Sequence, residues 1–149
     1  MTFDELLRIL VQRKGSDLHL VAGLYPAIRV HGELVPLSDK EKLNPQSAKE
    51  LIYSVLREFV EILKKNKVPV WRLYLFGSYA KDSFDQDSDI DLAVFWDKED
   101  IDGFDEDVFL MGLRRDLDTR IEPHSFARTD FDETDPFIRE IIETGKRLV

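Results

Sequence analysis

The spacing of apolar residues predicts helices alternating with strands along the 149-residue chain. Residues 3–12 carry apolar side chains at positions 3, 6, 7, 10 and 11, which form one face of a helix. Three further helices are predicted, at about 45–66, at 104–117 and from Pro136 to about Gly145. Strands are predicted at 17–21, at 27–37 with a turn at His31-Gly32, at 71–76, at 89–95 and at 117–122. This alternation indicates an α/β (α+β) fold, in which helices flank a small mixed sheet.

Composition sets the broad class of the protein. Hydrophobic residues make up 43% of the chain and aromatic residues 11%, which is enough for a core in one domain, or in one domain with an appendage. Cysteine is absent, so disulfides and thiolate metal sites are excluded. The first residues contain acids and no long apolar run, so a signal peptide or membrane span is not supported. We therefore expect a cytoplasmic protein without membrane contact.

A Gly-Ser turn followed by two carboxylates is the most specific chemical feature of the chain. Gly77 and Ser78 follow the predicted strand 71–76, and ten residues later Asp89 and Asp91 open the next strand. Glycine lets backbone N–H groups approach a phosphate, and side chains two apart on a strand share a face. Such a carboxylate pair suits two divalent cations ~3.5–4 Å apart, as in phosphoryl-type transfer. The combination indicates nucleotidyl transfer from a nucleoside triphosphate.

The Asp-x-Asp pattern alone would not support this interpretation. It occurs seven times in the chain, but only the pair at 89 and 91 follows a strand and a Gly-Ser turn at this spacing. The alternative is that both acids are solvated charges beside an ordinary turn. Two carboxylates that begin a buried strand repel each other and need compensation, which favours a functional site.

Residues 57–149 resemble the minimal nucleotidyltransferases (MNT) of the DNA polymerase beta-like superfamily. The hallmark of that superfamily is Gly-Ser, ten residues and Asp-x-Asp, and the resemblance extends through the blocks 73–81, 88–94, 121–126 and 131–141. It implies a polymerase beta-like nucleotidyltransferase fold and activity. One departure stands out: the family usually has glycine where this chain has Asp82. A carboxylate there would repel a triphosphate, so a catalytically inactive protein is an alternative.

The resemblance also implies a third carboxylate on a later strand. In the predicted strand 117–122, Asp118, Arg120 and Glu122 alternate onto one face. Asp118 best fits the family pattern of an acid between hydrophobic residues, and Glu122 is the runner-up. The two lie roughly 13 Å apart along a strand, so both would not contact one metal ion. Arg120 either pairs with a carboxylate or reaches a phosphate.

These residues define the expected site. Asp89, Asp91 and Asp118 are the expected catalytic residues and ligands of two Mg²⁺ ions, and ATP is the expected substrate. Gly77 and Ser78 are expected to bind its β- and γ-phosphates. Lys81 is either a third nucleotide-binding residue or an ordinary surface lysine.

Charge is distributed unevenly along the chain. Residues 1–56 hold seven basic and seven acidic residues, so residues 57–149 carry the whole net charge of −9. Residues 82–107 contain twelve acids and one lysine. Such a surface repels nucleic acid backbones, so we expect no nucleic acid partner and a small-molecule or protein acceptor instead. Part of this charge belongs to a segment, 97–107, that is interpreted as a solvated loop.

Members of this family often act as antitoxins that attach AMP to a tyrosine of a HEPN-type toxin, and the resemblance implies that role here. The acidic surface suits a basic partner. Two alternatives stay open. A non-catalytic antitoxin or interaction module would neutralise its partner by binding alone. A small-molecule transferase, like those that modify aminoglycosides, would need an additional helical domain that this chain lacks.

Residues 1–56 resemble the start of the N-terminal domain of type IV pilus retraction ATPases. The blocks 15–24, 26–34 and 51–56 carry the resemblance, which implies a partial PAS-like extension. The chain contains no Gly-x-x-x-x-Gly-Lys-Ser/Thr motif, so ATP-driven retraction is excluded. We predict a domain boundary between residues 56 and 57. The extension would cover an exposed face of the transferase or mediate homo-oligomer formation.

The three histidines are weaker candidates. His19 and His31 lie twelve residues apart without a clear third ligand, so ordinary strand histidines are expected rather than a metal site. His124 falls near the proposed site, where we expect a supporting or surface residue rather than a catalytic base.

Overall fold

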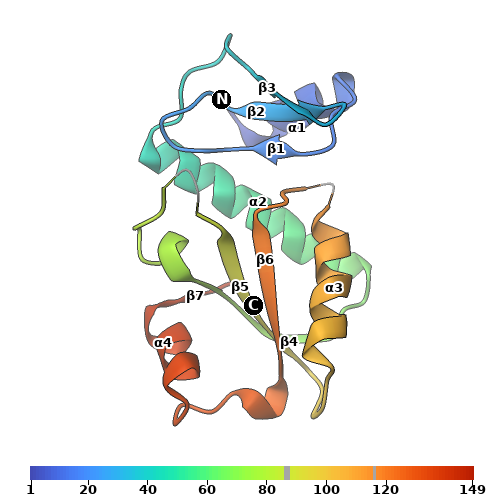
Figure 1. Cartoon of the computed structure of the whole chain (residues 1–149), viewed down its shortest axis with the longest axis vertical. Helices are drawn as coiled ribbons and strands as arrows, with labels where there is room; N and C mark the ends of the chain where they lie inside the picture. Colours follow the sequence, from blue (N-terminus) through green and yellow to red (C-terminus); the bar gives the residue numbers. More distant parts are fainter. Residues whose placement is uncertain (86–87, 116) are drawn as a thin grey trace. The chain divides into compact units, whose positions relative to one another are not determined.

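The computed structural model describes residues 1–85, 88–115 and 117–149 and divides into two compact units. The first unit contains Met1–Phe59 and Arg114–Thr119, and the second contains Val60–Leu113 and Arg120–Val149. Figure 1 shows the elements of both. Among the described residues, no helix is both long and apolar enough to cross a membrane.

The first unit begins with helix α1 (Phe3–Gln12), which has the predicted bounds. Thr2 and Glu5 form a reciprocal cap: Glu5 N donates to Thr2 Oγ1 at 3.2 Å, and Thr2 N donates to Glu5 Oε2 at 3.1 Å. The helix buries Leu6 and Leu10, two residues of the predicted apolar face. Local sequence therefore determines both the start of α1 and its inward side.

A three-stranded antiparallel sheet, in the order β1-β2-β3, follows α1. Its strands are β1 (Leu18–His19), β2 (Ala27–Val30) and β3 (Glu33–Pro36), with the turn at His31 and Gly32 where it was predicted. His31 therefore lies in a turn and not on a strand. Within the described residues, no group of three or more His, Cys, Asp or Glu side chains could by itself hold a metal ion.

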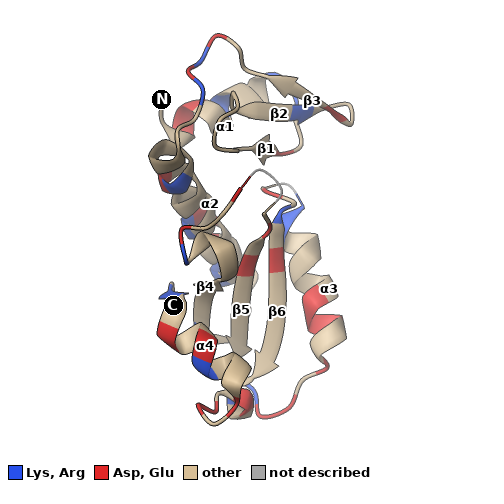
Figure 2. Ribbon diagram, turned by 60° about the vertical axis from the view of Figure 1, so that its left-hand side comes forward, with Lys and Arg blue, Asp and Glu red and all other residues tan. Residues whose placement is uncertain are grey.

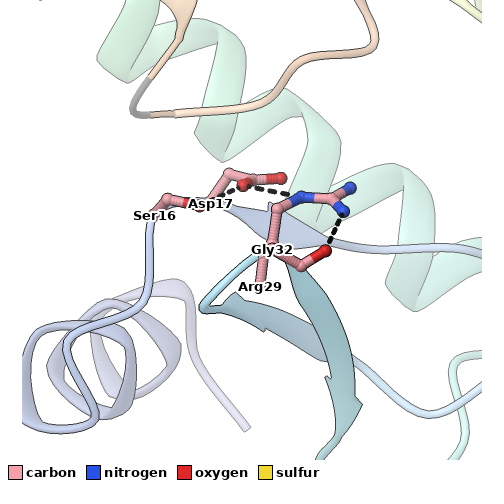
Figure 3. A network of polar contacts seen from close by, with 4 residues as sticks. All are labelled: Ser16, Asp17, Arg29 and Gly32. Atoms are coloured by element: carbon pink, nitrogen blue, oxygen red, sulfur yellow. Dashed lines mark hydrogen bonds and ion pairs between the residues drawn. The ribbon is translucent and has the colours of Figure 1, made fainter.

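Asp17, just before β1, is buried and held by the network in Figure 3. Ser16 Oγ donates to Asp17 Oδ1 at 2.6 Å, and Arg29 Nε donates to the same oxygen at 3.2 Å. Arg29 Nη1 also donates to the Gly32 carbonyl at 3.3 Å. These contacts tie β1 to β2 and supply the hydrogen bonds that a buried carboxylate needs.

Helix α2 (Pro45–Lys65) confirms the predicted helix at 45–66. Ser47 N donates to Asn44 Oδ1 at 2.8 Å, so Asn44 caps the helix and Pro45 begins it. The border between the two units falls inside α2, after Phe59. The domain boundary between residues 56 and 57 stays a prediction.

The second unit is built on a mixed sheet in the order β6-β5-β4-β7. Its strands are β4 (Val70–Phe76), β5 (Ile90–Trp96), β6 (Ile121–Ala127) and β7 (Lys146–Arg147). Strand β5 is antiparallel to β4 and parallel to β6, and β7 adds an antiparallel edge that was not predicted. A mixed sheet with flanking helices confirms the predicted fold class.

Two helices complete this unit, α3 (Gly103–Arg114) and α4 (Pro136–Thr144). Ile138 and Ile141 of α4 pack on Tyr74, Ala93 and Phe95 of the sheet. Helix α4 begins at Pro136 and ends before Gly145, as predicted, and Asp135 caps its start. Gly145 is required for space, because a Cβ there would meet the Ile141 carbonyl oxygen and lie 2.9 Å from the Leu75 carbonyl oxygen.

The strand predicted at 117–122 was placed too early in the sequence. Helix α3 ends at Arg114, and β6 runs from Ile121 to Ala127, through Pro123. Proline is tolerated because β6 is an edge strand, so one side of its backbone needs no ladder hydrogen bonds. Of the three alternating polar residues, only Glu122 lies on the strand, and Asp118 and Arg120 precede it.

Candidate active site

The Gly-Ser turn lies at the end of β4, where a short 3-10 turn, Gly77–Tyr79, follows Phe76. Two backbone hydrogen bonds close the loop: Lys81 N donates to the Gly77 carbonyl at 3.2 Å and Ser83 N to the Ser78 carbonyl at 2.9 Å. Gly77 has φ +74°, and a Cβ at this position would lie 2.6 Å from Asp91 Oδ2. Glycine is therefore required by backbone conformation and by the carboxylate packed against the turn.

Three carboxylates meet beside this turn. Asp91, on β5, is the register partner of Phe76 on β4 and of Glu122 on β6, and Asp89 immediately precedes β5. Partners in a ladder project their side chains to the same face, so Glu122 stands next to Asp91. Figure 2 shows acidic bands side by side on β5 and β6. The structure thus gathers Asp89, Asp91 and Glu122.

The crowding of these groups appears in the pKa of Glu122. A hydrogen bond to Asp89 raises that pKa above its usual value, and burial and the negative charges of Asp89 and Asp91 add to the effect. The charge of the nearby His124 lowers the pKa of Glu122. The raised pKa of Glu122 therefore reflects the crowding of negative charge at this end of the sheet.

Asp118, the first choice for the third carboxylate, lies in a different setting. It is buried, with 1% of its surface exposed, in the segment Arg114–Thr119 that belongs to the first unit. Because β6 begins at Ile121, Asp118 is not on the strand that lies beside β5. Glu122, the runner-up, is the acid that β6 places next to Asp91.

His124 supports the carboxylates from β6. Its Nε2 lies 3.3 Å from Asp91 Oδ1, and its ring meets Phe76 edge-on, with 5.3 Å between ring centroids. The hydrogen bond to Asp91 raises the pKa of His124, burial lowers it, and the charges of Asp91, Glu122 and Asp107 raise it further. Sequence reasoning expected a supporting or surface residue but did not identify Asp91 as its partner.

Lys81 lies at a small pocket next to the turn. The pocket has a volume of about 180 Å³ and is lined by Phe76, Gly77, Lys81, Phe137, Glu140, Ile141 and Thr144. Lys81 Nζ lies 2.7 Å from Glu140 Oε1, and both side chains are largely exposed. Such an exposed ion pair is weak and readily exchanged for another anion. No local pattern could have predicted Glu140, which is 59 residues away in sequence.

Two further residues of the loop region were singled out from sequence. Asp82 has φ +56°, in the left-handed region that favours glycine, which is the residue expected here from the family resemblance. Arg120 Nη1 donates to Tyr79 Oη at 3.3 Å, so this arginine anchors the turn after Ser78. A contact of Arg120 with a side chain of the turn was not among the predicted alternatives.

The donor set suits a hard cation. Asp89, Asp91 and Glu122 offer only oxygen atoms, which Mg²⁺ prefers, and a bound cation would offset the mutual repulsion that raises the pKa of Glu122. The described residues contain no complete metal cage of three or more ligands. Mg²⁺ typically uses one or two carboxylates together with substrate phosphates, so two or three acids beside this turn would be sufficient.

Comparisons with known proteins agree with this geometry. The model of the family described as Polymerase beta, Nucleotidyltransferase matches residues 57–149. A protein of Methanocaldococcus jannaschii, described as "Putative protein adenylyltransferase MJ1379", is 32% identical over 99 residues. The match covers 62% of this chain and 88% of that protein.

The N-terminal part matches a different protein. It is 38% identical over 58 residues to the type IV pilus ATPase PilU of Pseudomonas aeruginosa. The match covers 39% of this chain but only 15% of the ATPase, so the chain spans a small fraction of that relative's length.

Two solved structures are also similar. A Sulfolobus solfataricus protein described as a "putative nucleotidyltransferase" gives a TM-score of 0.49 at 17% identity, covering 69% of this chain and 84% of that chain. A mutant of the toxin-antitoxin pair MntA-HpeT gives a TM-score of 0.43 at 23% sequence identity. That match covers 62% of this chain and 70% of the other chain. On the match of the family model to residues 57–149, the chain belongs to the polymerase beta nucleotidyltransferase family.

Proposed function

We propose that the chain transfers a nucleoside monophosphate, AMP from ATP, to a hydroxyl group in a Mg²⁺-dependent reaction. The acceptor oxygen forms a bond to the α-phosphorus, the bond to pyrophosphate breaks, and the hydroxyl proton leaves. The observation that carries the proposal is the contact between Gly77 and Asp91, in which a backbone turn without a Cβ packs against a carboxylate. This contact supports the proposal because it brings the turn that we expect to bind phosphate next to a group of acids.

The turn would bind the triphosphate. Gly77 supplies an open backbone, and Ser78 a hydroxyl, for the β- and γ-phosphates. Lys81, whose ammonium group now pairs with Glu140, is close enough in sequence and space to exchange that carboxylate for a phosphate oxygen. The weakness of an exposed ion pair makes the exchange inexpensive in free energy.

The carboxylates would hold the metal. Asp89 and Asp91 would hold two Mg²⁺ ions, and Glu122, with Asp118 as the alternative, is the proposed third ligand. When bound, Mg²⁺ would supply neutralisation of charge on the leaving pyrophosphate and a lower pKa of the attacking hydroxyl. The third carboxylate would accept the proton of that hydroxyl. His124 is hydrogen-bonded to Asp91 and would orient the Asp91 carboxylate.

The proposed acceptor is a hydroxyl on a protein. The Methanocaldococcus relative, which is described as a protein adenylyltransferase, supports this class of acceptor. The family resemblance supports a tyrosine of a HEPN-type toxin, with this chain as antitoxin. The acidic second half of the chain fits a basic protein.

Label transfer from α-³²P-ATP tests the proposal. The full chain is incubated with Mg²⁺ and the product of the adjacent gene, or with cell extract, and compared with Asp89→Asn/Asp91→Asn. Asp39→Asn/Glu41→Gln is the matched control, because it removes two exposed acids at the same spacing in the other unit. We expect a labelled protein band with wild type and control and none with the site variant. Equal labelling by the site variant would contradict the proposal.

Asp82 supports a second candidate, an antitoxin that acts by binding alone. A negative residue in the glycine conformation of the loop, beside a lysine already paired with Glu140, disfavours triphosphate. A stable complex with the partner protein, without labelling and without Mg²⁺-dependent nucleotide binding, would favour this candidate. Labelling restored by Asp82→Gly would instead identify Asp82 as a residue that slows an active enzyme.

A further inference from the structure

Helix α3 turns apolar side chains outward. Phe104 is 76% exposed, Val108 52%, Phe109 47% and Met111 37%. The opposite side holds Leu110, which is fully buried, and Asp107, whose Oδ1 accepts a hydrogen bond from Ser125 N of β6 at 2.7 Å. A helix that packs only on its own sheet buries its apolar side and exposes its polar side. The outer side of α3 therefore presents more apolar surface than the fold of this chain uses.

Three of these residues form a continuous surface. Phe104, Val108 and Met111 are spaced i, i+4 and i+7, so they lie on one side of the helix. We call these three residues the α3 stripe. Gly112 lies beside it, and a Cβ there would meet no atom within 4 Å. Glycine inside a helix costs roughly 0.5–1 kcal/mol relative to alanine, and no contact within the unit requires it. Gly112 therefore leaves open space beside the stripe.

Acidic residues border the α3 stripe. Residues 97–107 contain seven acids and one lysine, and this lysine, Lys98, pairs with Glu106 at 3.7 Å. Asp100, Asp102 and Asp105 are exposed. Figure 2 shows the acidic bands on α3. An apolar strip with a negative border attracts a surface of the opposite charge and repels one of the same charge.

This charge pattern selects among possible occupants. In a two-fold dimer the same patch would face itself, so a second copy would bring two acidic borders together. A nucleic acid would be repelled by the same acids. A helix with an apolar face and Lys or Arg at its edges would cover the α3 stripe and pair with its acidic border.

We propose that the α3 stripe is a docking surface for an amphipathic, positively charged helix of a partner protein. The apolar face of that helix covers Phe104, Val108 and Met111, and its basic residues face Asp100 and Asp105. The proposal goes beyond nucleotidyl transfer and does not depend on it, because docking requires neither nucleotide nor metal.

Peptide binding by the full chain, measured by fluorescence anisotropy without nucleotide, tests the proposal. The probe is a labelled peptide of roughly 18 residues, five helical turns, with Leu on one face and Lys elsewhere. Two comparison peptides carry Glu in place of Lys, or the same Leu and Lys composition in scrambled order. We expect binding of the amphipathic Lys peptide and at least about ten-fold weaker binding of the other two.

Two sets of variants locate the binding surface. Phe104→Ser/Val108→Ser/Met111→Ser removes the stripe from exposed positions, and Val11→Ser/Leu24→Ser/Leu34→Ser removes three exposed apolar residues from the other unit as a matched control. We expect about ten-fold weaker binding for the first and less than about two-fold change for the second. Asp100→Asn/Asp105→Asn should weaken binding several-fold and reduce its salt dependence, whereas Asp39→Asn/Glu41→Gln should not. Circular dichroism melting checks that every variant is folded.

Three results would overturn the proposal. Equal loss of binding in the stripe variant and its control would indicate a non-specific apolar surface. Equal binding of the scrambled peptide would indicate simple charge attraction. A wild-type dimer in sedimentation velocity that dissociates in the stripe variant would assign the surface to a second copy of the chain.

Discussion

Two groups of acids, one in each unit, differ in what surrounds their carboxylates. Asp17 in the first unit is buried, and its Oδ1 accepts hydrogen bonds from Ser16 and Arg29 (Figure 3). Asp89, Asp91 and Glu122 in the second unit lie close to one another, a hydrogen bond to Asp89 raises the pKa of Glu122, and His124 contacts Asp91. A buried carboxylate supplied with donors stabilises a fold, whereas carboxylates crowded together favour a bound cation.

Removing one acid from the second site should produce the largest effect. We expect Asp91→Asn to reduce label transfer roughly 10²–10³-fold, the range found when one preorganised electrostatic group is removed from an active site. The free energy of unfolding in metal-free buffer should change little, because relief of the repulsion with Glu122 and Asp89 is offset by loss of the contact with His124. Initial rates and urea unfolding of the same preparations measure both. Full activity of Asp91→Asn would show that Asp91, like Asp17, does not take part in label transfer.

The roles of Glu122 and Asp118 can be distinguished by substituting each residue in turn. We expect Glu122→Gln to lower transfer by about 10²-fold without loss of stability, by the same electrostatic argument. Asp118→Asn, which changes a buried residue of the first unit, should lower the midpoint of thermal unfolding and leave transfer by the folded protein nearly unchanged. The reverse pattern would return the third-carboxylate role to Asp118.

A substitution in the Asp17 network should lower the stability of the protein without changing label transfer. We expect Asp17→Asn to reduce the free energy of unfolding by about 1–2 kcal/mol, since hydrogen bonds to a buried charge are lost. Label transfer well below the melting temperature should change less than about two-fold, within ordinary variation for a residue away from the site. Urea unfolding and initial rates check this. A large loss of transfer in folded protein would contradict the division between the two sites.

Replacing Asp82 should have a smaller effect, and it should raise stability and ATP affinity rather than lower them. Its φ of +56° costs a non-glycine residue about 0.5–1 kcal/mol, so Asp82→Gly should raise the free energy of unfolding by up to that amount. The variant should also bind ATP more tightly, because a negative charge beside the phosphate turn is removed. Asp85→Asn is the control for charge alone. Unchanged stability and affinity would show that Asp82 is neutral in the loop.

A pH effect should come from His124. Its pKa is raised above 6.5 by Asp91, so folding favours the protonated form. The resulting stabilisation is fully present below pH 6.5 and is lost as the pH rises through the raised pKa. The difference in unfolding free energy between wild type and His124→Gln should therefore shrink as the pH rises above 6.5 and through the raised pKa of His124. In Asp91→Asn this pH dependence should weaken, because the hydrogen bond that contributes most to the raised pKa is gone while the charges of Glu122 and Asp107 remain.

Sequence predicted the elements with strong local signals. Helices α1, α2 and α4 lie where the sequence predicted them, and their starts are local, because Thr2, Asn44 and Asp135 bond to their own first turns. Strands β4 and β5 were predicted from hydrophobic runs next to the Gly-Ser turn. Strand β6 was misplaced because its edge position, which permits Pro123, is a property of the assembled sheet.

The site was predictable as far as residue types and spacing determine it. The close approach of Gly77 to Asp91 follows from the motif, because only glycine fits such a turn. The position of Glu122 beside Asp91 depends on the register of a parallel strand pair, which no local pattern specifies. The pairing of Lys81 with Glu140 joins β4's loop to α4 and likewise depends on tertiary packing.

We infer that the carboxylates of the second unit bind a metal–nucleotide complex and that Asp17 does not contribute. Isothermal titration calorimetry with a non-hydrolysable ATP analogue, in the presence of Mg²⁺ or of EDTA, measures this binding. We expect Mg²⁺-dependent binding by wild type, Asp17→Asn and Asp39→Asn/Glu41→Gln, and loss of that binding in Asp89→Asn/Asp91→Asn. Equal affinity of all four proteins, or binding that EDTA leaves unchanged, would contradict it.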